Sequence, residues 1–482
     1  MTVGEEAVLR LLSDPAVAGL PDPVRSAGGG GRSWVVGGAV RDALLGHEIT
    51  DVDLVVDADP GAVARAIAGG LDGVAFELSD EFGTWRSQGR DFSWQVDVAA
   101  LRGGSIEADL GLRDFTVGAI AIALEGGYLI DPTGGLDDLA AGVLRAVSES
   151  SFRDDPLRVI RASRLAAQFG WEIEGGTLVL ASESAAMLGS VAGERILSEF
   201  LLLVGSRDPL GGIEKFDRTG AMEVVLPEIT GLKGVVQGPN HHLDVHGHTI
   251  EVLEGVLRIE TELDRFVGDA AVATSAYLAE PLADSTDRAV GLRLGALFHD
   301  CAKPETRTER DGVVGFRGHD ELGADKVGDV FDRLRASRRL SRHVADLTRH
   351  HLILGFMAAS GPPSPEAVYD YLRRTSPVSV DVTLLTVADR LAARGSGTVA
   401  SSEMIEAHLE LASRMVAEGL EWRETGPPVL PIPGDELARE VGLEPGPELG
   451  RLIERLERAV WTGQVDSASD AVTLAREILQ ED

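Results

Sequence analysis

The pattern of apolar and polar residues changes character near residue 150. Before that point, short β-type runs (SWVVGG, DVDLVVD, WQVDVAAL and GYLIDP) alternate with two segments of helical type, GAVARAIAGG and FTVGAIAIAL. After it, the apolar residues follow a helical period, as in PLRVIRASRLAAQF and GRLIERLERAVWTG. A period of two indicates strands and a period near 3.6 indicates helices. The pattern therefore predicts an α+β protein in which an α/β head precedes an all-α remainder.

Glycine- and proline-rich tracts predict where the chain divides into parts. The tract SAGGGGRS at 26–33 predicts a flexible break after a loosely attached helical lead-in. Further tracts occur at VVQGPNHH near residue 238, at GPPSP and at TGPPVLPIPG. We therefore expect five parts: a lead-in at 1–33, a head at 34–147, a helical neck at 148–237, a histidine-rich domain at 238–400 and a helical tail at 401–482.

Composition narrows the functions that this chain can perform. Of its 482 residues, 44% are hydrophobic, which is enough for buried cores. The formal net charge of -33 argues against nonspecific adhesion to nucleic acid, so any RNA site must be local. The sequence contains no apolar run long enough to span a membrane, and MTVGEEAVLR lacks the pattern of a signal peptide, so we expect a cytoplasmic protein. The single cysteine, Cys301, is expected to be a small buried core residue.

Two aspartates in ITDVDLVVD indicate a metal site. If this segment is a strand, Asp51 and Asp53 lie on the same face with Cα atoms about 6 to 7 Å apart. Two carboxylates so placed can hold the pair of hard cations used in phosphoryl transfer, and Asp97 on a later strand could complete the site. The same two aspartates would also suit the solvent face of a half-buried strand, so the motif needs its context.

The segment VVGGAVRD supplies that context. Gly37 and Gly38 end a predicted strand just before a helix, so triphosphate oxygens could approach bare backbone N–H groups at the helix N-terminus. Arg41 follows as a forked donor for phosphate. The glycines and the aspartates together favour nucleotide chemistry, whereas a simple turn would explain the glycines alone.

These motifs resemble a known family. GGAVRD followed by DVD, LRDFTVGAIAI, IDPTGGLDDL and RDDPLRVIRASRLAAQFG resembles the nucleotidyltransferase superfamily that includes class II tRNA nucleotidyltransferases (CCA-adding enzymes) and bacterial poly(A) polymerases. The resemblance implies a head like that of DNA polymerase beta, with Mg²⁺ on Asp51 and Asp53. It also implies that Arg113 and Asp114 contact the ribose and triphosphate. Residues that would shape the nucleotide pocket are Asp155, Arg158, Arg161 and Arg164.

The pair Asp155 and Arg158 also has a chemical interpretation of its own. Residues three apart are neighbours on a helix, so this pair could present an acceptor beside a donor. Cytosine and adenine each carry an amino group beside a ring acceptor, which such a pair satisfies, whereas uracil and guanine would leave buried polar groups unpaired. An exposed ion pair of little energetic value is the alternative.

Nine of the 11 histidines lie between residues 241 and 351, which predicts a second site. The pair His299-Asp300 resembles the signature of HD-type metal-dependent phosphohydrolases, and the resemblance implies that His248 and Asp389 complete a first metal site. Lys303 could steady a phosphate. A divalent transition metal (Mn, Ni or Fe) suits such ligands, and a second metal could be held by His319 together with His350 or His351.

The sequence departs from the family at two pocket positions and in one segment. Leu112 replaces an arginine and Gly118 replaces an asparagine, and the segment 102–111 is short. We expect addition of CMP and AMP from CTP and ATP to the tRNA 3′ end, with no membrane partner, and the oligomeric state stays open. A poly(A) polymerase and a CC-adding enzyme are the nearest alternatives. An HD phosphohydrolase with an inactive RNA-binding head is a more distant one.

Overall fold

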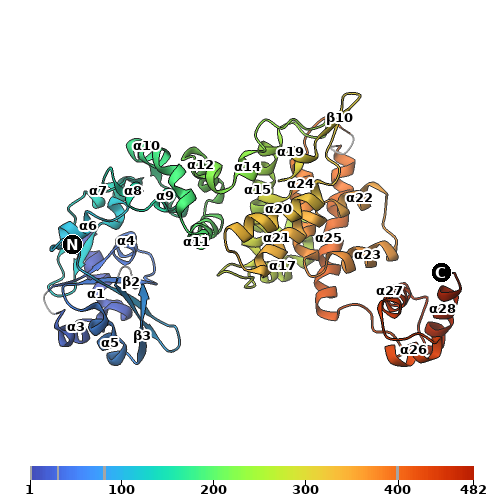
Figure 1. The fold of residues 1–482 in the computed structure, drawn as a ribbon, viewed down its shortest axis with the longest axis horizontal. Helices are drawn as coiled ribbons and strands as arrows, with labels where there is room; N and C mark the ends of the chain where they lie inside the picture. The colour runs from blue at the N-terminus through green and yellow to red at the C-terminus, as the bar shows by residue number, and fades with distance from the viewer. Residues whose placement is uncertain (1–2, 30–31, 80–82, 398–400, 482) are drawn as a thin grey trace. The chain divides into compact units, whose positions relative to one another are not determined.

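The computed structural model describes residues 3–29, 32–79, 83–397 and 401–481. The chain divides into two compact units, of which unit 1 comprises 1–191 with 206–224, and unit 2 comprises 192–205 with 225–482. Figure 1 shows a sheet in the N-terminal part and helices through most of the remaining chain. The expected order of an α/β head followed by a helical remainder is confirmed.

A seven-stranded sheet forms the centre of unit 1, with the strand order β3, β4, β5, β2, β1, β6, β7. Strands β2 and β5 run parallel, and the other neighbouring pairs are antiparallel. In the parallel register Asp53 lies directly opposite Asp97. The strands are β1 Ser33–Val36, β2 Val52–Val56, β3 Gly73–Ser79, β4 Thr84–Gly89, β5 Gln95–Ala100, β6 Ala121–Ala123 and β7 Leu129–Ile130.

Two hydrophobic clusters hold the sheet between helices. On one face, α4 (Gly38–Leu45) and α5 (Pro60–Gly70) pack against a cluster that includes Val52 and Leu54. On the other, α6 (Ile106–Leu110) packs against Trp34, Val36 and Val55. Because alternate residues of β2 enter opposite faces, the strand is nearly all buried and Asp53 is its exposed position.

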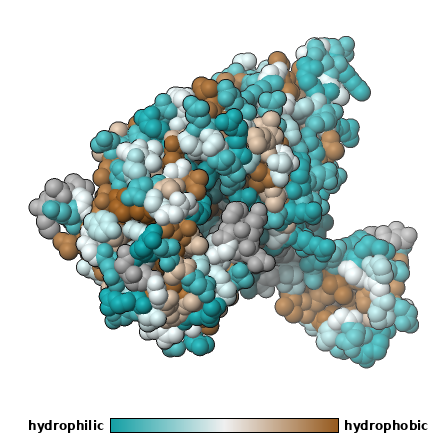
Figure 2. All heavy atoms as spheres, turned by 60° about the vertical axis from the view of Figure 1, so that its left-hand side comes forward, coloured by the Kyte–Doolittle hydropathy of each residue, from teal (hydrophilic) through white to brown (hydrophobic). Residues whose placement is uncertain are grey.

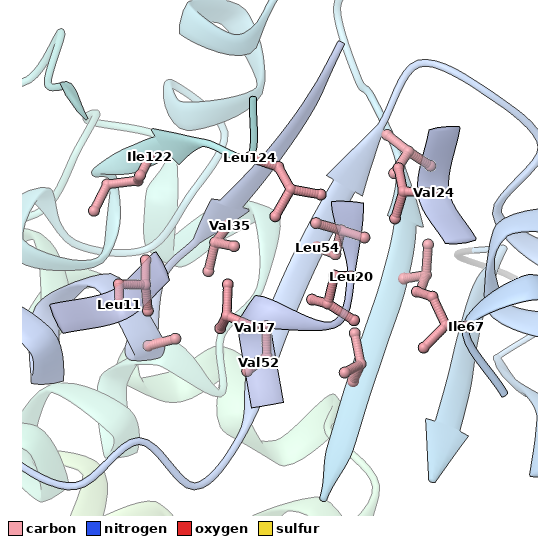
Figure 3. Close-up of a cluster of buried hydrophobic side chains, with 14 of the residues drawn as sticks. Leu11, Val17, Leu20, Val24, Val35, Val52, Leu54, Ile67, Ile122 and Leu124 are labelled. Atoms are coloured by element: carbon pink, nitrogen blue, oxygen red, sulfur yellow. The ribbon is translucent and has the colours of Figure 1, made fainter. Parts of the chain in front are cut away.

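The expected lead-in is not loosely attached, and this prediction is wrong. Helices α1 (Val3–Ser13), α2 (Pro15–Ala18) and α3 (Pro21–Val24) bury Leu11, Val17, Leu20 and Val24 in the same cluster as the sheet residues. Figure 3 shows Leu11, Val17, Leu20 and Val24 among the side chains of this cluster, which also include Val35, Leu54 and Ile122. The glycines of SAGGGGRS suggested a separation, but the buried apolar residues before them decide the packing. Residues 30–31 of that tract lie outside the described ranges.

One further element differs from the expectation. The segment FTVGAIAIAL was predicted to be helical, but it forms a 3-10 turn at Thr116–Gly118 followed by β6. Residues Ala119 to Leu124 are buried throughout, and an apolar run buried on all sides carries no periodicity that distinguishes a strand from a helix. The expected strands at β1, β2, β5 and β7 are confirmed, whereas the hairpin of β3 and β4 was not foreseen.

The expected neck at 148–237 is shared between the two units. Helices α8 (Ser151–Asp154), α9 (Arg158–Phe169), α10 (Gly175–Ser184) and α12 (Pro209–Arg218) belong to unit 1. Helices α11 (Gly193–Val204) and α14 (Pro227–Thr230) belong to unit 2. Composition did not mark this division, because apolar residues at helical spacing continue across it in α9, α11 and α12.

The histidine-rich part of unit 2 is built from long helices. Helix α15 packs against α18 and α24, α20 packs along α21, and α25 packs along α24. The expected boundary at residue 400 therefore cuts through a packed group, and a separate core that includes Ile432 begins only beyond α25. The helices are α15 Val245–Thr261, α18 Arg288–Phe298, α20 His319–Arg333, α21 Arg338–His350, α24 Ser379–Ala392 and α25 Ser402–Thr425.

The last helices, α26 (Gly434–Val441), α27 (Pro447–Trp461) and α28 (Ala468–Glu481), enclose a small core of their own around Leu437, Leu452 and Leu456. Among the described residues no helix has the length and hydrophobicity needed to cross a membrane. On the face that Figure 2 presents, hydrophilic side chains surround smaller hydrophobic patches.

Candidate functional sites

The first candidate site lies where β1 ends and α4 begins. Gly37 links the two with φ 71° and ψ -128°, a conformation that L side chains rarely adopt. A Cβ atom there would lie 3.0 Å from Nη1 of Arg113 and 3.2 Å from Oδ2 of Asp53. Glycine therefore lets a guanidinium and a carboxylate approach the N-terminus of α4, as the predicted turn requires.

A polar pocket of about 290 Å³ opens at this turn. Its lining brings together nine of the residues proposed from the sequence: Gly37, Gly38, Arg41, Asp51, Asp53, Arg113, Asp114, Arg161 and Arg164. Two carboxylates that can hold a cation thus share a pocket with four guanidinium groups that can bind phosphate oxygens. This donor set fits Mg²⁺ with a triphosphate, because hard cations take oxygen ligands.

The charges in the pocket are coupled. Limited hydration raises the pKa of Asp53, and the nearby Asp97 and Asp51 act in the same direction against Arg113 and Arg161. Although burial acts the other way, the Arg161 guanidinium, with Nε 2.7 Å from Oδ2 of Asp114, and the Phe115 amide lower the pKa of Asp114. A cation bound beside Asp53 would reduce the electrostatic repulsion among Asp51, Asp53 and Asp97.

Asp97, the third carboxylate proposed for the metal site of the head, is not among the described residues that line the pocket. Nε and Nη2 of Arg86 donate to its two oxygens at 2.7 and 2.8 Å. Each oxygen accepts one hydrogen bond and keeps a second lone pair, and the negative charge of Asp97 lies close enough to raise the pKa of Asp53. Its place in the metal site stays a prediction.

Asp155 and Arg158 differ from the helical pair that the sequence suggested. Asp155 is extended, with φ -147° and ψ 101°, and it precedes α9, where its Oδ1 accepts from the Leu157 N–H at 3.2 Å. The Arg158 guanidinium donates to the backbone carbonyls of Leu112, Arg113 and Ser151. Pro156 explains the break, since the residue before a proline avoids helical backbone. Neither side chain is among the described residues that line the pocket.

Sequence reasoning missed three of the pocket's polar residues: Asp42, Thr50 and Gln168. Asp42 accepts from Nε and Nη2 of Arg41 at 2.9 and 3.0 Å, and the same guanidinium lies 4.5 Å from the Phe169 ring centroid. The adjacency of Arg41 and Asp42 in the sequence was the feature that could have indicated this ion pair. Arg41 is therefore held in place by α4 and α9, ready to face a ligand.

The second candidate site lies in unit 2, where four histidines and Asp389 lie around Asp300. Oδ2 of Asp300 lies 3.1 Å from Nε2 of His299 and 3.7 Å from Nε2 of His248. Its Oδ1 lies 3.2 Å from Nε2 of His319 and 3.9 Å from Nε2 of His351. Asp389 adds an oxygen 3.0 Å from Nε2 of His248. Asp300 thus bridges two groups, His248 with His299 and Asp389, and His319 with His351.

Hydrogen bonds fix the orientation of three of these imidazoles. Nδ1 of His299 lies 2.8 Å from Ala296 O. Nδ1 of His319 lies 2.6 Å from Phe316 O, and Nδ1 of His351 lies 2.6 Å from Thr348 O. A carbonyl can only accept, so Nδ1 carries the proton and Nε2 keeps a lone pair for a metal. Burial, reinforced by His299 and His319, lowers the pKa of His351 to about 4, which keeps it neutral at neutral pH. The arrangement fits two transition-metal ions.

The two adjacent histidines differ in position, since His351 belongs to a ligand group with Asp300 and His319. His350 is outside both ligand groups of the described residues. A cavity of about 630 Å³ adjoins the site, and Asp300, Lys303, His319, His351 and Asp389 all line it. Nζ of Lys303 lies 2.6 Å from Oδ2 of Asp300 and donates to Oε1 of Gln237 at 2.7 Å. Cys301, next to the site, is buried as expected.

Three family models match this chain. The Poly A polymerase head domain matches residues 33–145, the HD domain matches 245–394, and the model described as "Probable RNA and SrmB- binding site of polymerase A" matches 170–232. The HD match contains both ligand groups around Asp300.

Relatives match over nearly the whole chain. An A-adding tRNA nucleotidyltransferase of Deinococcus radiodurans is 34% identical over 91% of this chain and 93% of its own length. A CC-adding tRNA nucleotidyltransferase of Geobacter sulfurreducens is 29% identical over 97% of this chain and 96% of its own length. The solved structure of a Thermotoga maritima CCA-adding enzyme with tRNA matches the fold with a TM-score of 0.62, at 23% identity, over 99% of this chain and 98% of that chain.

Proposed function

Because this chain belongs to the tRNA nucleotidyltransferase and poly(A) polymerase family with an HD domain, we propose that it adds CMP and AMP from CTP and ATP to the 3′ end of tRNA. It is an enzyme of the tRNA nucleotidyltransferase class. The observation that carries the proposal is the pocket at Gly37, where the carboxylates of Asp51 and Asp53 meet four guanidinium groups beside a helix N-terminus.

Each part of that pocket has a role in phosphoryl transfer. Asp51 and Asp53 would hold Mg²⁺, which, when bound, supplies positive charge to the attacking 3′ hydroxyl and the leaving pyrophosphate. Gln95 donates to Oδ1 of Asp51 at 3.1 Å and so orients that carboxylate. The arginines bind the triphosphate oxygens, and Gly37 leaves the space in which a phosphate can meet the backbone.

Base selection is proposed for Asp155 and Arg158. The pair lies at the start of α9, and Arg158 is tied to the carbonyls of Leu112 and Arg113, next to the pocket residue Asp114. Asp155 offers acceptors and Arg158 offers donors, the two kinds of group that cytosine and adenine require. Asp114 and Arg161, which form an ion pair inside the pocket, also offer an acceptor and a donor and are the alternative pair for base selection.

Addition of only part of the CCA sequence is a second candidate. Relatives of the A-adding and CC-adding kinds both match this chain over more than 90% of its length. Leu112 and Gly118 each lack a polar group that family members place in the nucleotide pocket, and Gly118 lines it. The adjoining segment 102–111 is also short, and in the family loops of this part of the head are tied to the change from C to A addition, so a CC-only enzyme is the narrower candidate.

The test is nucleotide incorporation by the purified full chain into three transcripts of one tRNA, ending before CCA, after C and after CC. Each is incubated with CTP, ATP or both. Extension of all three to CCA supports the first candidate, and extension that starts or stops at CC supports the second. Repeated AMP addition to unrelated RNA would identify a poly(A) polymerase, and no incorporation would leave an inactive RNA-binding head.

For the HD domain we propose a separate metal-dependent phosphohydrolase activity. The supporting observation is the shared carboxylate Asp300, which faces two groups of imidazole and carboxylate ligands at the edge of a cavity. Lys303, beside Asp300, would bind the phosphate of a substrate. Its ligands come from unit 2 alone, so hydrolysis should not depend on the aspartates of the head.

The test replaces His299 and Asp300 together by Ala, with His242→Ala as the control in the same unit. The double variant should lose transition metal and the hydrolysis of phosphomonoester and 2′,3′-cyclic phosphate substrates, while nucleotide addition continues. His242, which lies 3.3 Å from Glu251 and outside both ligand groups, should be replaceable without metal loss. Equal metal content in the wild type and the double variant would exclude the proposed metal site.

A further inference from the structure

An arginine-rich segment stands out in this acidic chain. Residues 333–343 read RLRASRRLSRH, with five arginines, one histidine and no carboxylate, although the whole chain has 78 acidic against 45 basic residues. The segment forms the turn between α20 and α21 and the first turns of α21. It lies outside the residues 170–232 that match the RNA-binding model.

Four of these arginines are exposed and have no acidic partner among the described residues. Arg333 is different, because its guanidinium forms an ion pair with Glu228 at 2.9 Å and donates to Val225 O. The side chains that extend outward are Arg335, Arg338, Arg339 and Arg342. Most other exposed arginines of unit 2, such as Arg258 and Arg265 with Glu262, pair with a carboxylate.

Local stability does not explain this placement. Arg338 and Arg339 occupy the first turn of α21, which contains no acidic residue, and a cation at a helix N-terminus opposes the helix dipole. Ser337 already caps the helix, since its Oγ accepts from the Leu340 N–H at 3.2 Å. The positive charge at this end therefore needs an explanation outside the helix.

The segment packs against helices that the RNA-binding model covers. Gly193, which opens α11, approaches the backbone of Arg333 and Leu334 so closely that an added Cβ would lie 2.4 Å from Arg333 O. Arg335 shares a cavity of about 510 Å³ with residues of α11, including Leu197 and Leu201. Arg333 also binds Glu228 of α14. All of these residues belong to unit 2, so the arginines and the matched helices form one continuous surface.

We propose that Arg335, Arg338, Arg339 and Arg342 bind the phosphate backbone of tRNA and extend the RNA-binding surface from α11 onto α21. The proposal rests on the proposed function of the chain. Guanidinium groups bind phosphate oxygens through paired hydrogen bonds, and unpaired arginines release counterions from RNA without first breaking an ion pair. The carboxylates Glu194 and Asp284 line the adjoining cavity and would repel the backbone, which confines the RNA to the arginine side.

The test compares two triple variants of the full chain that remove the same number of charges. The first is R338Q/R339Q/R342Q. The matched control is R258Q/R265Q/R414Q, in which three exposed and carboxylate-paired arginines of the same unit are replaced. Dissociation constants for a tRNA transcript without its CCA end are measured by fluorescence anisotropy over a range of KCl concentrations, and thermal unfolding checks that both variants fold.

We expect the first variant to bind tRNA about ten- to hundredfold more weakly at 0.1 M KCl, with a salt slope reduced by about 2 to 3. The KM for tRNA should rise while kcat and the KM values for CTP and ATP stay unchanged. The control should change binding by less than about threefold. Equal weakening in both variants, or none in either, would overturn the proposed surface.

The outcomes also separate this inference from the proposed function. If the wild type binds tRNA through the arginines but adds no nucleotide, the surface stands and the proposed function fails. If the wild type adds nucleotides and R338Q/R339Q/R342Q binds tRNA as tightly as the control, the surface is refuted and the proposed function stands.

Discussion

The N-terminal helices should stabilise the head, and Leu11→Ala measures by how much. Leu11 has no exposed surface and lies in the cluster that also holds Val35 of β1 and Leu54 of β2. Loss of a buried leucine side chain costs about 3 to 5 kcal/mol when its surroundings cannot collapse into the space. Leu9, two residues earlier on α1, is 55% exposed, so Leu9→Ala should cost no more than about 0.5 kcal/mol.

The assay is amide hydrogen exchange of the full chain, followed by mass spectrometry on peptides from β1 and β2. A loss of about 3 kcal/mol accelerates exchange through unfolding of the head roughly a hundredfold. Peptides from α15 and α18 in unit 2 should exchange at unchanged rates. If Leu11→Ala and Leu9→Ala give the same small change in β1 and β2, the N-terminal helices do not share the core of the head and the packing argument fails.

Three further predictions concern the two sites and the thiol beside one of them. Asp155→Ala should reduce the preference for CTP over UTP, measured as the ratio of kcat/KM values, more than it slows CTP incorporation; an unchanged ratio would assign base selection to Asp114 and Arg161. His351→Ala should lower the content of bound transition metal, whereas His350→Ala should preserve it; equal losses by elemental analysis would contradict the assignment of ligands. Burial raises the pKa of the Cys301 thiol to about 12, so the folded protein should resist alkylation at pH 8 and react only once unit 2 unfolds; rapid labelling of the native chain would show that the thiol is accessible.

The head was predictable where local chemistry and tertiary structure agree. DVDLVVD forms a strand because its apolar residues enter the core and leave Asp53 as the exposed position. Gly37 adopts a backbone conformation that needs glycine, and for this reason the glycine is visible as a signal in the sequence. Together with the two aspartates that follow it, this glycine indicated a site. The ligands His248, His299, Asp300 and Asp389 were identified by resemblance, and they meet in space although they span more than 140 residues of sequence.

The predictions that were wrong or incomplete concern features that depend on contacts between residues far apart in the sequence. The strand β6 is buried on all sides, so its apolar residues carried no period, and the N-terminal helices are held by long-range packing that a glycine tract does not reveal. The role of Arg158 as a donor to three backbone carbonyls could not be predicted, because two of those carbonyls, of Leu112 and Arg113, come from a turn that is distant in the sequence. Sequence spacing placed His350 and His351 equally, and only the direction of each side chain separates them.

The central claim is that the carboxylates at the Gly37 turn carry out nucleotide transfer to tRNA, and Asp53→Asn tests it most directly. The measurement is incorporation of labelled CTP and ATP into tRNA lacking its CCA end, at saturating Mg²⁺. Asp57→Asn is the control, since Asp57 follows the same strand but pairs with Arg32 outside the pocket lining. We predict a loss of at least about hundredfold for Asp53→Asn in a protein that still binds tRNA, with near-normal rates for the control. Turnover by Asp53→Asn close to that of the wild type would contradict the claim.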